Sequence, residues 1–307
     1  MHYCIIRVRI GDNMFTPFGN IVTAMVTPFD KDGNLAKDLV EGLVNHLVGS
    51  GTDTILVGGT TGESPTLTED ELFTLIEATK GHLDSKTKLL VGSGTNSTAK
   101  SVSLSKKVVS QGADGVLLVN PYYNKPTQAG LDAHFRAVAE AIDVPIMLYN
   151  IPGRTAVNML PETIEKLAEV PNIVAVKEAA GSVEQCAKIR SLLPEDEFAI
   201  YSGDDSLTLP MLSVGAVGVV SVASHIAGKK IRKMITKFFE GDVQDAKSIH
   251  LKLVPLFEAL FVRSNPIPVK YAMNKIGVSV GGYRLPLTPL DDEAKEIVNA
   301  ALKSMGY

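Results

Sequence analysis

Eight short apolar runs, separated by segments with helical spacing, constrain the fold of this chain more than any other feature. Most of them are rich in valine, isoleucine and leucine and lack alternating polar residues. That pattern is typical of strands buried on both faces of a parallel sheet. The runs begin at Ile21, Thr54, Lys88, Gly115, Pro145, Asn172, Phe198 and Gly218.

The segments between the runs carry recognisable helix signals. Thr68 is followed three residues later by Glu71, which is the spacing of a capping box. Pro161 stands where a helix tolerates proline, in its first turn. After the seventh run, Asp205 or Ser206 is expected to cap a short helix. Strands and helices are therefore predicted to alternate along the chain.

The number of units decides between two α/β architectures. Eight strand–helix units in roughly 220 residues match a (β/α)8 TIM barrel, which typically takes about 250 residues. The alternative, a doubly wound open sheet, predicts a glycine-rich phosphate loop after the first strand. The turn after the first run reads DKDGN, and no GxGxxG or GxxxxGK[ST] motif follows any run. We therefore expect the barrel.

The chain is expected to have three parts. Residues 14–240 are predicted to form the barrel, and residues 241–307 a C-terminal helical extension punctuated by prolines. An extra helical layer of this kind has a natural use in packing or in contacts between subunits. Residues 1–13 are interpreted as an N-terminal extension outside the fold, with an ordinary first strand as the alternative.

Composition excludes several classes of protein. The 307 residues are 45% hydrophobic and 21% charged, as in globular proteins, and the net charge of −4 offers no footprint for nucleic acid. No apolar run reaches about 18 residues, so no membrane span is predicted. Cys4 and Cys186 cannot form a disulfide framework and fit a cytoplasmic protein. The scattered histidines predict no metal site.

Lys177 is the most telling polar residue, because it ends a buried apolar run and barrel active sites lie at the carboxyl ends of the strands. Burial lowers the pKa of a lysine, and a neutral amine can form a Schiff base with a carbonyl substrate. The alternative is a lysine that reaches solvent and pairs with Glu178. No Ser-His-Asp set stands out beside it.

Other strand ends carry groups that suit a small carboxylate substrate. The Gly58–Gly62 loop can cradle an anion with its amides and the hydroxyls of Thr60 and Thr61. Tyr149 can pass protons, and Arg154 can bind a carboxylate. Taken singly, the loop could be a flexible turn, the tyrosine a core residue and the arginine a surface residue.

Six motifs resemble the dihydrodipicolinate synthases, a family within the pyruvate-dependent class I aldolase superfamily. They occur in the family's order from about Phe15 to the C-terminal helices: GGTTGESPTLT, PYYNKPTQAG, LYNIPGRT, VKEA, YSGDD and NPIPVK. The resemblance implies a lyase that condenses pyruvate with L-aspartate 4-semialdehyde to give 4-hydroxy-tetrahydrodipicolinate for lysine and diaminopimelate biosynthesis. It implies no cofactor.

The same resemblance assigns roles to the catalytic positions. Lys177 would form the Schiff base with pyruvate, and Tyr149 would be the general acid and base. Thr60 would link Tyr149 to Tyr123 in a proton relay, with Tyr123 supplied by the neighbouring subunit. A dimer would then be part of the active site. A homotetramer built as a dimer of dimers is the first expectation, with a dimer as the alternative.

The resemblance also assigns substrate contacts. Thr61 would hold the pyruvate carboxylate, and Val220 would contact pyruvate from the eighth strand. Arg154 would meet the carboxylate of L-aspartate 4-semialdehyde, and the carbonyl of Gly203 would help to bind that second substrate.

Rival functions lie inside and outside the superfamily. An N-acetylneuraminate lyase or a sugar-acid aldolase would share Lys177 and Tyr149. Three features resemble the synthase pattern more: the Thr60-Thr61 pair, the Tyr122-Tyr123 pair and Arg154. A non-catalytic barrel used as a regulator would be expected to lose Lys177 or Tyr149, and both are present.

One departure from the family concerns regulation. Members inhibited by lysine carry an allosteric pocket, and the matching positions here are Ser64, Glu69, Leu72, Asn96, Lys100 and Tyr122. Lys100 puts a like charge where the ammonium of lysine should be neutralised, and Leu72 removes a polar partner. Weak or absent inhibition by lysine is therefore predicted.

Overall fold

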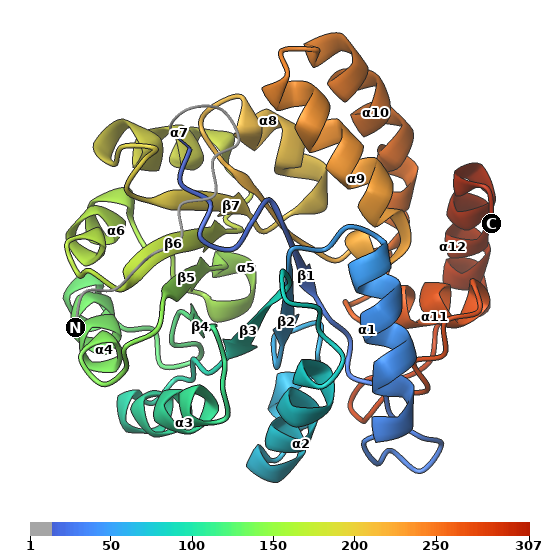
Figure 1. Ribbon diagram of the computed structural model, residues 1–307, viewed down its shortest axis with the longest axis horizontal. Coiled ribbons are helices and arrows are strands. Elements are labelled where there is room, and N and C mark those ends of the chain that lie inside the picture. The colour runs from blue at the N-terminus through green and yellow to red at the C-terminus, as the bar shows by residue number, and fades with distance from the viewer. Residues whose placement is uncertain (1–13) are drawn as a thin grey trace. The chain divides into compact units, whose positions relative to one another are not determined.

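The strands form the closed parallel barrel that the sequence predicts. The computed structural model describes residues 14–307, and β1 to β8 pair in chain order as a closed barrel. Figure 1 labels most of these strands and the helices around them. Nearly every strand residue is buried, as expected for apolar strands covered on both faces. The strands are β1 (Ile21–Ala24), β2 (Thr54–Val57), β3 (Lys88–Gly92), β4 (Gly115–Val119), β5 (Ile146–Asn150), β6 (Ile173–Glu178), β7 (Ala199–Ser202) and β8 (Gly218–Ser221).

Helices follow the strands, and local sequence signals fix several of their ends. The capping box of Thr68 and Glu71 is confirmed. The cap predicted after β7, Asp205 or Ser206, is wrong, because the capping side chain is that of Asp204, which accepts the hydrogen bond from the amide of Ser206. The helices are α1 (Val40–Gly49), α2 (Glu69–Lys80), α3 (Thr98–Ser110), α4 (Gln128–Ala139), α5 (Pro152–Thr155), α6 (Pro161–Ala168), α7 (Val183–Leu192), α8 (Thr208–Leu212), α9 (Ser224–Phe239), α10 (Val243–Ala259), α11 (Ile267–Lys275) and α12 (Asp292–Met305).

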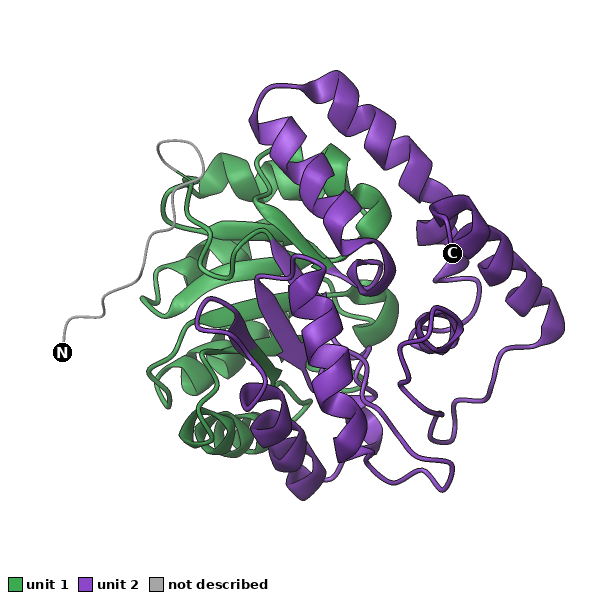
Figure 2. Cartoon of the chain, turned by 45° about the vertical axis from the view of Figure 1, so that its right-hand side comes forward, with its two compact units in different colours: residues 1–20, 90–220 green, residues 21–89, 221–307 purple. Residues whose placement is uncertain are grey.

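The chain divides into two compact units, coloured in Figure 2. Among the described residues, unit 1 comprises residues 14–20 and Leu90–Val220, and unit 2 comprises Ile21–Leu89 and Ser221–Tyr307. The predicted division into residues 14–240 and 241–307 stays a prediction. The predicted extension, with Cys4, lies outside the described residues.

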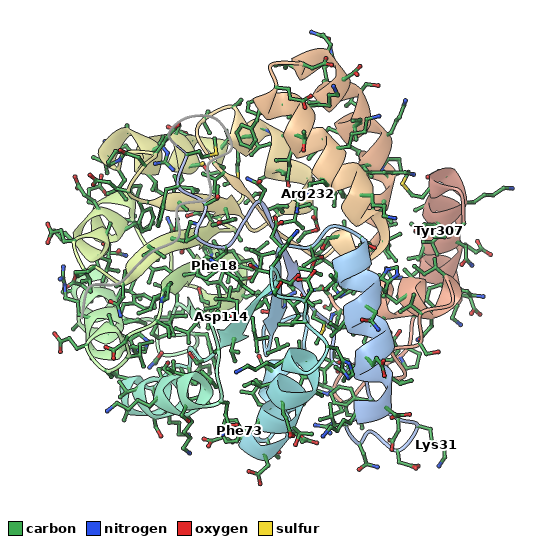
Figure 3. All side chains as sticks on the ribbon, viewed as in Figure 1. Phe18, Lys31, Phe73, Asp114, Arg232 and Tyr307 are labelled. Atoms are coloured by element: carbon green, nitrogen blue, oxygen red, sulfur yellow. The ribbon has the colours of Figure 1, made fainter. Side chains whose placement is uncertain are left out.

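The core of unit 1 is sealed by the segment that precedes β1. The Phe18 ring, labelled in Figure 3, meets the Tyr201 ring edge-on, with centroids 6.4 Å apart. The Tyr201 hydroxyl donates to the carbonyl of Gly19 at 2.8 Å. A Cβ on Gly218 would lie 2.1 Å from the carbonyl oxygen of Asn20, so only glycine fits at the start of β8.

In unit 2, charged and polar contacts tie α9 to the strands. Arg232, also labelled in Figure 3, pairs with Asp53 at 2.6 Å, and Asp53 accepts the amide of Ile21 at 2.9 Å. The hydroxyl of Thr23 lies 2.8 Å from that of Ser224. The first C-terminal helices pack in series, α10 against α9 and α12 against both α10 and α11.

Candidate active site

Lys177 and Tyr149 form the centre of a polar cluster in unit 1. They are register partners on the parallel strands β6 and β5, so their side chains point to the same face of the sheet. Both are buried, with Lys177 6% exposed and Tyr149 4% exposed. The Lys177 Nζ lies 4.1 Å from the centroid of the Tyr149 ring. The amine is therefore held against an aromatic face with little access to water.

Burial dominates the acid–base behaviour of this lysine. Desolvation lowers the pKa of Lys177 to about 7, with the charge of Asp205 opposing the shift and that of Arg154 adding to it. A lysine in water has a pKa near 10.4. A large share of the Lys177 side chains is therefore neutral at pH 7, and a neutral amine is nucleophilic.

The neighbouring carboxylate does not pair with this amine. Glu178 faces the opposite side of β6, where it accepts hydrogen bonds from Asn150 and Gln185, each at 3.0 Å, and from the amide of Ala180 at 2.6 Å. Burial raises the pKa of Glu178, and these hydrogen bonds oppose the shift. The alternative interpretation of Lys177 as a partner of Glu178 is therefore wrong.

Sequence reasoning treated Asp205 only as a helix cap and missed its relation to the amine. Asp205 is 3% exposed, lies in a 3-10 turn after β7, and is the main charge that raises the pKa of Lys177. The signal that could have found it is its place in YSGDD, directly after a strand that neighbours β6.

Gly203, also in YSGDD, provides the space that Lys177 fills. A Cβ at position 203 would lie 2.7 Å from the Cβ of Ala179 and 3.1 Å from both Cγ and Cε of Lys177. The Gly203 amide is fixed by a 2.8 Å hydrogen bond to the carbonyl of Glu178. The position of the lysine chain therefore depends on the absence of a side chain here.

The substitution Gly203→Ala is expected to displace Lys177 and, if this lysine reacts with the substrate, to lower kcat/KM by up to about 10²-fold, since small misplacements of reacting groups have effects of that size. Steady-state kinetics with a thermal melt would measure it. Gly42→Ala is the matched control, because nothing lies within 4 Å of a Cβ there. Equal kinetics in the two variants would contradict the steric role of Gly203.

The Thr60-Thr61 loop belongs to unit 2. Its turn is closed by a 3.1 Å hydrogen bond from the amide of Gly62 to the carbonyl of Gly59. Within residues 14–307, the amides of Thr60 and Thr61 donate to no other protein group. Thr61 is 3% exposed. Two adjacent unused amides and a hydroxyl make this loop chemically suited to an anion.

The remaining predicted site residues differ in exposure. Arg154 is an exposed residue of α5, and its charge nevertheless reaches Lys177. Val220, at the end of β8, is 1% exposed. Tyr123 is 89% exposed with a positive φ of 76°, so its ring is not packed into the cluster around Lys177.

The positions that match the lysine pocket have mixed surroundings. Leu72 is 6% exposed and belongs to the apolar core, while Lys100 and Glu69 are exposed. Tyr122 is 39% exposed, Ser64 is half-buried in a 3-10 turn, and the carbonyl of Asn96 accepts a hydrogen bond from Asn124 at 2.9 Å. A buried leucine offers no polar contact to an amino acid ligand.

Three other features bear on the chemistry of the described residues. Cys186 is a free, buried cysteine, and burial raises the pKa of its thiol to about 12. Residues 14–307 contain no group of three or more His, Cys, Asp or Glu side chains placed to hold a metal ion. No helix in this range has both the length and the apolar character needed to cross a bilayer.

A closed parallel barrel with a buried lysine and other polar groups after its strands has the architecture of a (β/α)8-barrel enzyme. The chain belongs to the dihydrodipicolinate synthetase family, whose model matches residues 17–305. The enzyme is accordingly an aldolase-type lyase, and the resemblance read from the motifs is confirmed.

Individual relatives agree over nearly the whole chain. The 4-hydroxy-tetrahydrodipicolinate synthase of Thermosynechococcus vestitus is 53% identical over 292 residues, covering 95% of this chain and 98% of the relative. Dihydrodipicolinate synthase of Cyanidioschyzon merolae with lysine bound superposes with a TM-score of 0.92 at 50% identity, covering 94% of this chain and 98% of that one. The chloride-inhibited dihydrodipicolinate synthase of Acinetobacter baumannii complexed with pyruvate superposes with a TM-score of 0.91 at 40% identity. That match covers 94% of this chain and 99% of the Acinetobacter chain.

Proposed function

We propose that this enzyme condenses pyruvate with L-aspartate 4-semialdehyde to give 4-hydroxy-tetrahydrodipicolinate, through a Schiff base on Lys177. The single observation that carries the proposal is the buried Lys177 amine, with its pKa lowered to about 7, against the Tyr149 ring. The names of the relatives and the pyruvate held by the Acinetobacter enzyme support the same reaction.

The proposed chemistry follows from a neutral amine beside a phenol. The amine of Lys177 attacks the C2 carbonyl of pyruvate, and loss of water gives an iminium ion. Removal of a methyl proton gives an enamine, whose carbon attacks the aldehyde of the second substrate. The amino group of that substrate then closes onto C2 and releases Lys177. Tyr149 carries protons to and from the reacting atoms, with Thr60 in its relay.

The carboxylates of the two substrates need separate partners. The unused amides of Thr60 and Thr61 support binding of the pyruvate carboxylate, with Val220 as an apolar contact. The exposed guanidinium of Arg154 suits the carboxylate of the second substrate, since arginine binds carboxylates through paired N–H groups. The carbonyl of Gly203 would accept a hydrogen bond from that same substrate.

The assembly is part of the proposal. Tyr123 is exposed on a loop with positive φ, which suits a side chain that completes the relay of a neighbouring subunit. We propose a homotetramer arranged as a dimer of dimers, with a dimer as the smallest complete unit, in the cytoplasm. Sedimentation together with activity measured across protein dilution would test whether the dimer is required.

Borohydride trapping tests the reaction directly. Reduction in the presence of pyruvate, followed by peptide mass spectrometry, is expected to give one adduct, on Lys177. In a separate sample without borohydride, addition of L-aspartate 4-semialdehyde to enzyme and pyruvate is expected to give the cyclised product. An adduct elsewhere, or none, would falsify the Schiff-base mechanism. An adduct without cyclised product, combined with cleavage of N-acetylneuraminate, would favour a lyase of the sialic-acid type.

The pH dependence of the reaction is expected to report the pKa of Lys177. Since the neutral amine reacts, kcat/KM for pyruvate should rise about tenfold per pH unit below the pKa and level off near pH 7. An unshifted lysine would keep this rise going toward pH 10.4. A profile that is flat from pH 5.5 to 7, or that still rises above pH 9, would contradict the assignment.

Lysine is expected to inhibit this enzyme weakly or not at all, although the Cyanidioschyzon relative binds lysine. Lys100 carries a like charge, and Leu72 is a buried apolar residue. Initial rates measured with increasing L-lysine at subsaturating pyruvate would check this. Half-inhibition at sub-millimolar lysine is the result that would overturn it.

A further inference from the structure

Unit 2 contains an ion pair that is buried on both sides. The Nζ of Lys270, on α11, lies 2.7 Å from Oε1 of Glu63, and the two side chains are 0% and 1% exposed. Removing two charges from water is costly, and a buried ion pair is often no better for stability than apolar residues of the same volume. Stability alone therefore does not explain this buried ion pair, and the groups that its two residues position are relevant.

Glu63 immediately follows the Thr60-Thr61 loop and is held in an unusual backbone conformation. Its φ is 54°, in the left-handed region that residues other than glycine seldom adopt. Its amide donates to the carbonyl of Thr60 at 3.0 Å. Such a conformation persists where the surroundings fix it. The ion pair with Lys270 fixes the carboxylate of Glu63. The hydrogen bond from the Glu63 amide to the Thr60 carbonyl then connects this fixed residue to the loop.

The surroundings of Lys270 leave this carboxylate little freedom. The Lys270 Nζ lies 4.5 Å from the centroid of Phe29 and 5.4 Å from that of Tyr283. The second oxygen of Glu63 accepts the amide of Arg284 at 3.2 Å. Both carboxylate oxygens are therefore engaged by the C-terminal segment.

A second contact reaches the loop directly. Asn265, just before α11, is 7% exposed, and its Nδ2 donates to Oγ1 of Thr61 at 2.8 Å. A threonine hydroxyl can accept from one group while donating its own hydrogen to another. Because Asn265 occupies the oxygen as a donor, the Thr61 hydrogen stays available for an acceptor such as a carboxylate.

We propose that segment 265–270 positions the Thr60-Thr61 loop for pyruvate: Asn265 aims the hydroxyl of Thr61, and Lys270 fixes the loop through Glu63. The inference rests on the proposed function, since it takes Thr61 as the group that meets the pyruvate carboxylate. It gives residues of the C-terminal helical region a role in substrate binding in addition to any role in assembly. They are positioning residues, because they act through the loop.

The Asn265 contact is tested by comparing two substitutions. Asn265→Ala is expected to misplace the Thr61 hydroxyl and so weaken its hydrogen bond to the charged carboxylate. KM for pyruvate should rise about tenfold, a typical effect for such a bond, with kcat and KM for the second substrate nearly unchanged. Asn265→Leu has nearly the same shape but neither an N–H donor nor a charge, and should raise KM about as much. Asn299→Ala, an exposed asparagine on α12, is the matched control.

If Asn265 acted by packing alone, the Leu variant would keep the wild-type KM. That result, or an unchanged KM in Asn265→Ala, would overturn the proposal. Both variants should still give the borohydride adduct on Lys177 at saturating pyruvate. Absence of the adduct in the wild-type enzyme would instead refute the proposed function, so the two failures are distinguishable.

The ion pair is tested by a double substitution. Lys270→Met leaves Glu63 buried without its partner, so it should lower Tm and raise KM for pyruvate. Lys270→Met combined with Glu63→Gln removes the stranded charge and should recover Tm, while KM stays raised because the loop has lost its anchor. Lys275→Met, at an exposed position of α11, is the control. Recovery of both Tm and KM in the double variant would show a purely stabilising pair and refute this role.

Discussion

Replacing Lys177 with methionine is expected to abolish the pyruvate adduct and to lower kcat/KM by about 10⁴-fold or more, as is usual when a covalent nucleophile is removed. Methionine matches the unbranched shape of lysine and suits a site that is 6% exposed. The fold should therefore survive while the chemistry is lost. Borohydride trapping with mass spectrometry and steady-state kinetics measure the two effects.

Stability provides the control for this variant. The pKa of Lys177 falls from its usual value in water, near 10.4, to about 7 on folding, so between these values the unfolded chain binds more protons than the native one. The free energy of unfolding of the wild type should therefore rise with pH across that window. The Lys177→Met variant should lack this rise, and its Tm at pH 7 should not be lower than that of the wild type. Lys166→Met, an exposed lysine of α6, should behave as wild type. Activity within tenfold of wild type for Lys177→Met would contradict the mechanism.

Tyr149→Phe is expected to lower kcat by roughly 10²- to 10⁴-fold, the usual contribution of a general acid or base. The substitution keeps the ring that lies 4.1 Å from the Lys177 Nζ and removes only the hydroxyl. The borohydride adduct should therefore still form, more slowly, on Lys177. Rapid-quench measurement of trapping and of product formation separates the two steps.

A matched variant guards against a general effect of losing a phenol. Tyr271→Phe removes a hydroxyl whose 3.2 Å hydrogen bond runs to the exposed residue Asn299. It should leave kcat unchanged. Equal rates for wild type and Tyr149→Phe would show that the Tyr149 ring only packs against the lysine and that another group carries the protons.

Features written in short stretches of sequence could be predicted. The eight strands follow from local runs of valine, isoleucine and leucine, and the start of α2 follows from the three-residue spacing of Thr68 and Glu71. The burial of Lys177 follows from its place at the end of such a run. The places of Tyr149, Thr61 and Arg154 after their strands indicated proton transfer and carboxylate binding, the family resemblance made those roles specific, and they remain predictions.

Features that depend on contacts between distant residues could not be predicted. Asn265 and Thr61 are separated by 204 positions, and Lys270 and Glu63 by 207, so no local pattern joins them. The alternative interpretation, in which Lys177 pairs with Glu178, is wrong although the two residues are adjacent in the sequence. Consecutive side chains of a strand point to opposite faces of the sheet, so Lys177 and Glu178 cannot meet while both belong to β6.

That alternation has a consequence for how β6 can change. A shift of this strand by one residue would exchange its two faces, bringing Glu178 to the side of Tyr149 and sending Lys177 outward. A carboxylate would then lie where the proposed mechanism needs a nucleophilic amine. Gln185 of α7 donates to Glu178 at 3.0 Å, a contact that forms only when Glu178 faces away from the tyrosine. This contact depends on the register of β6, and insertions or deletions in β6 are expected to lower activity far more than substitutions on its outer face.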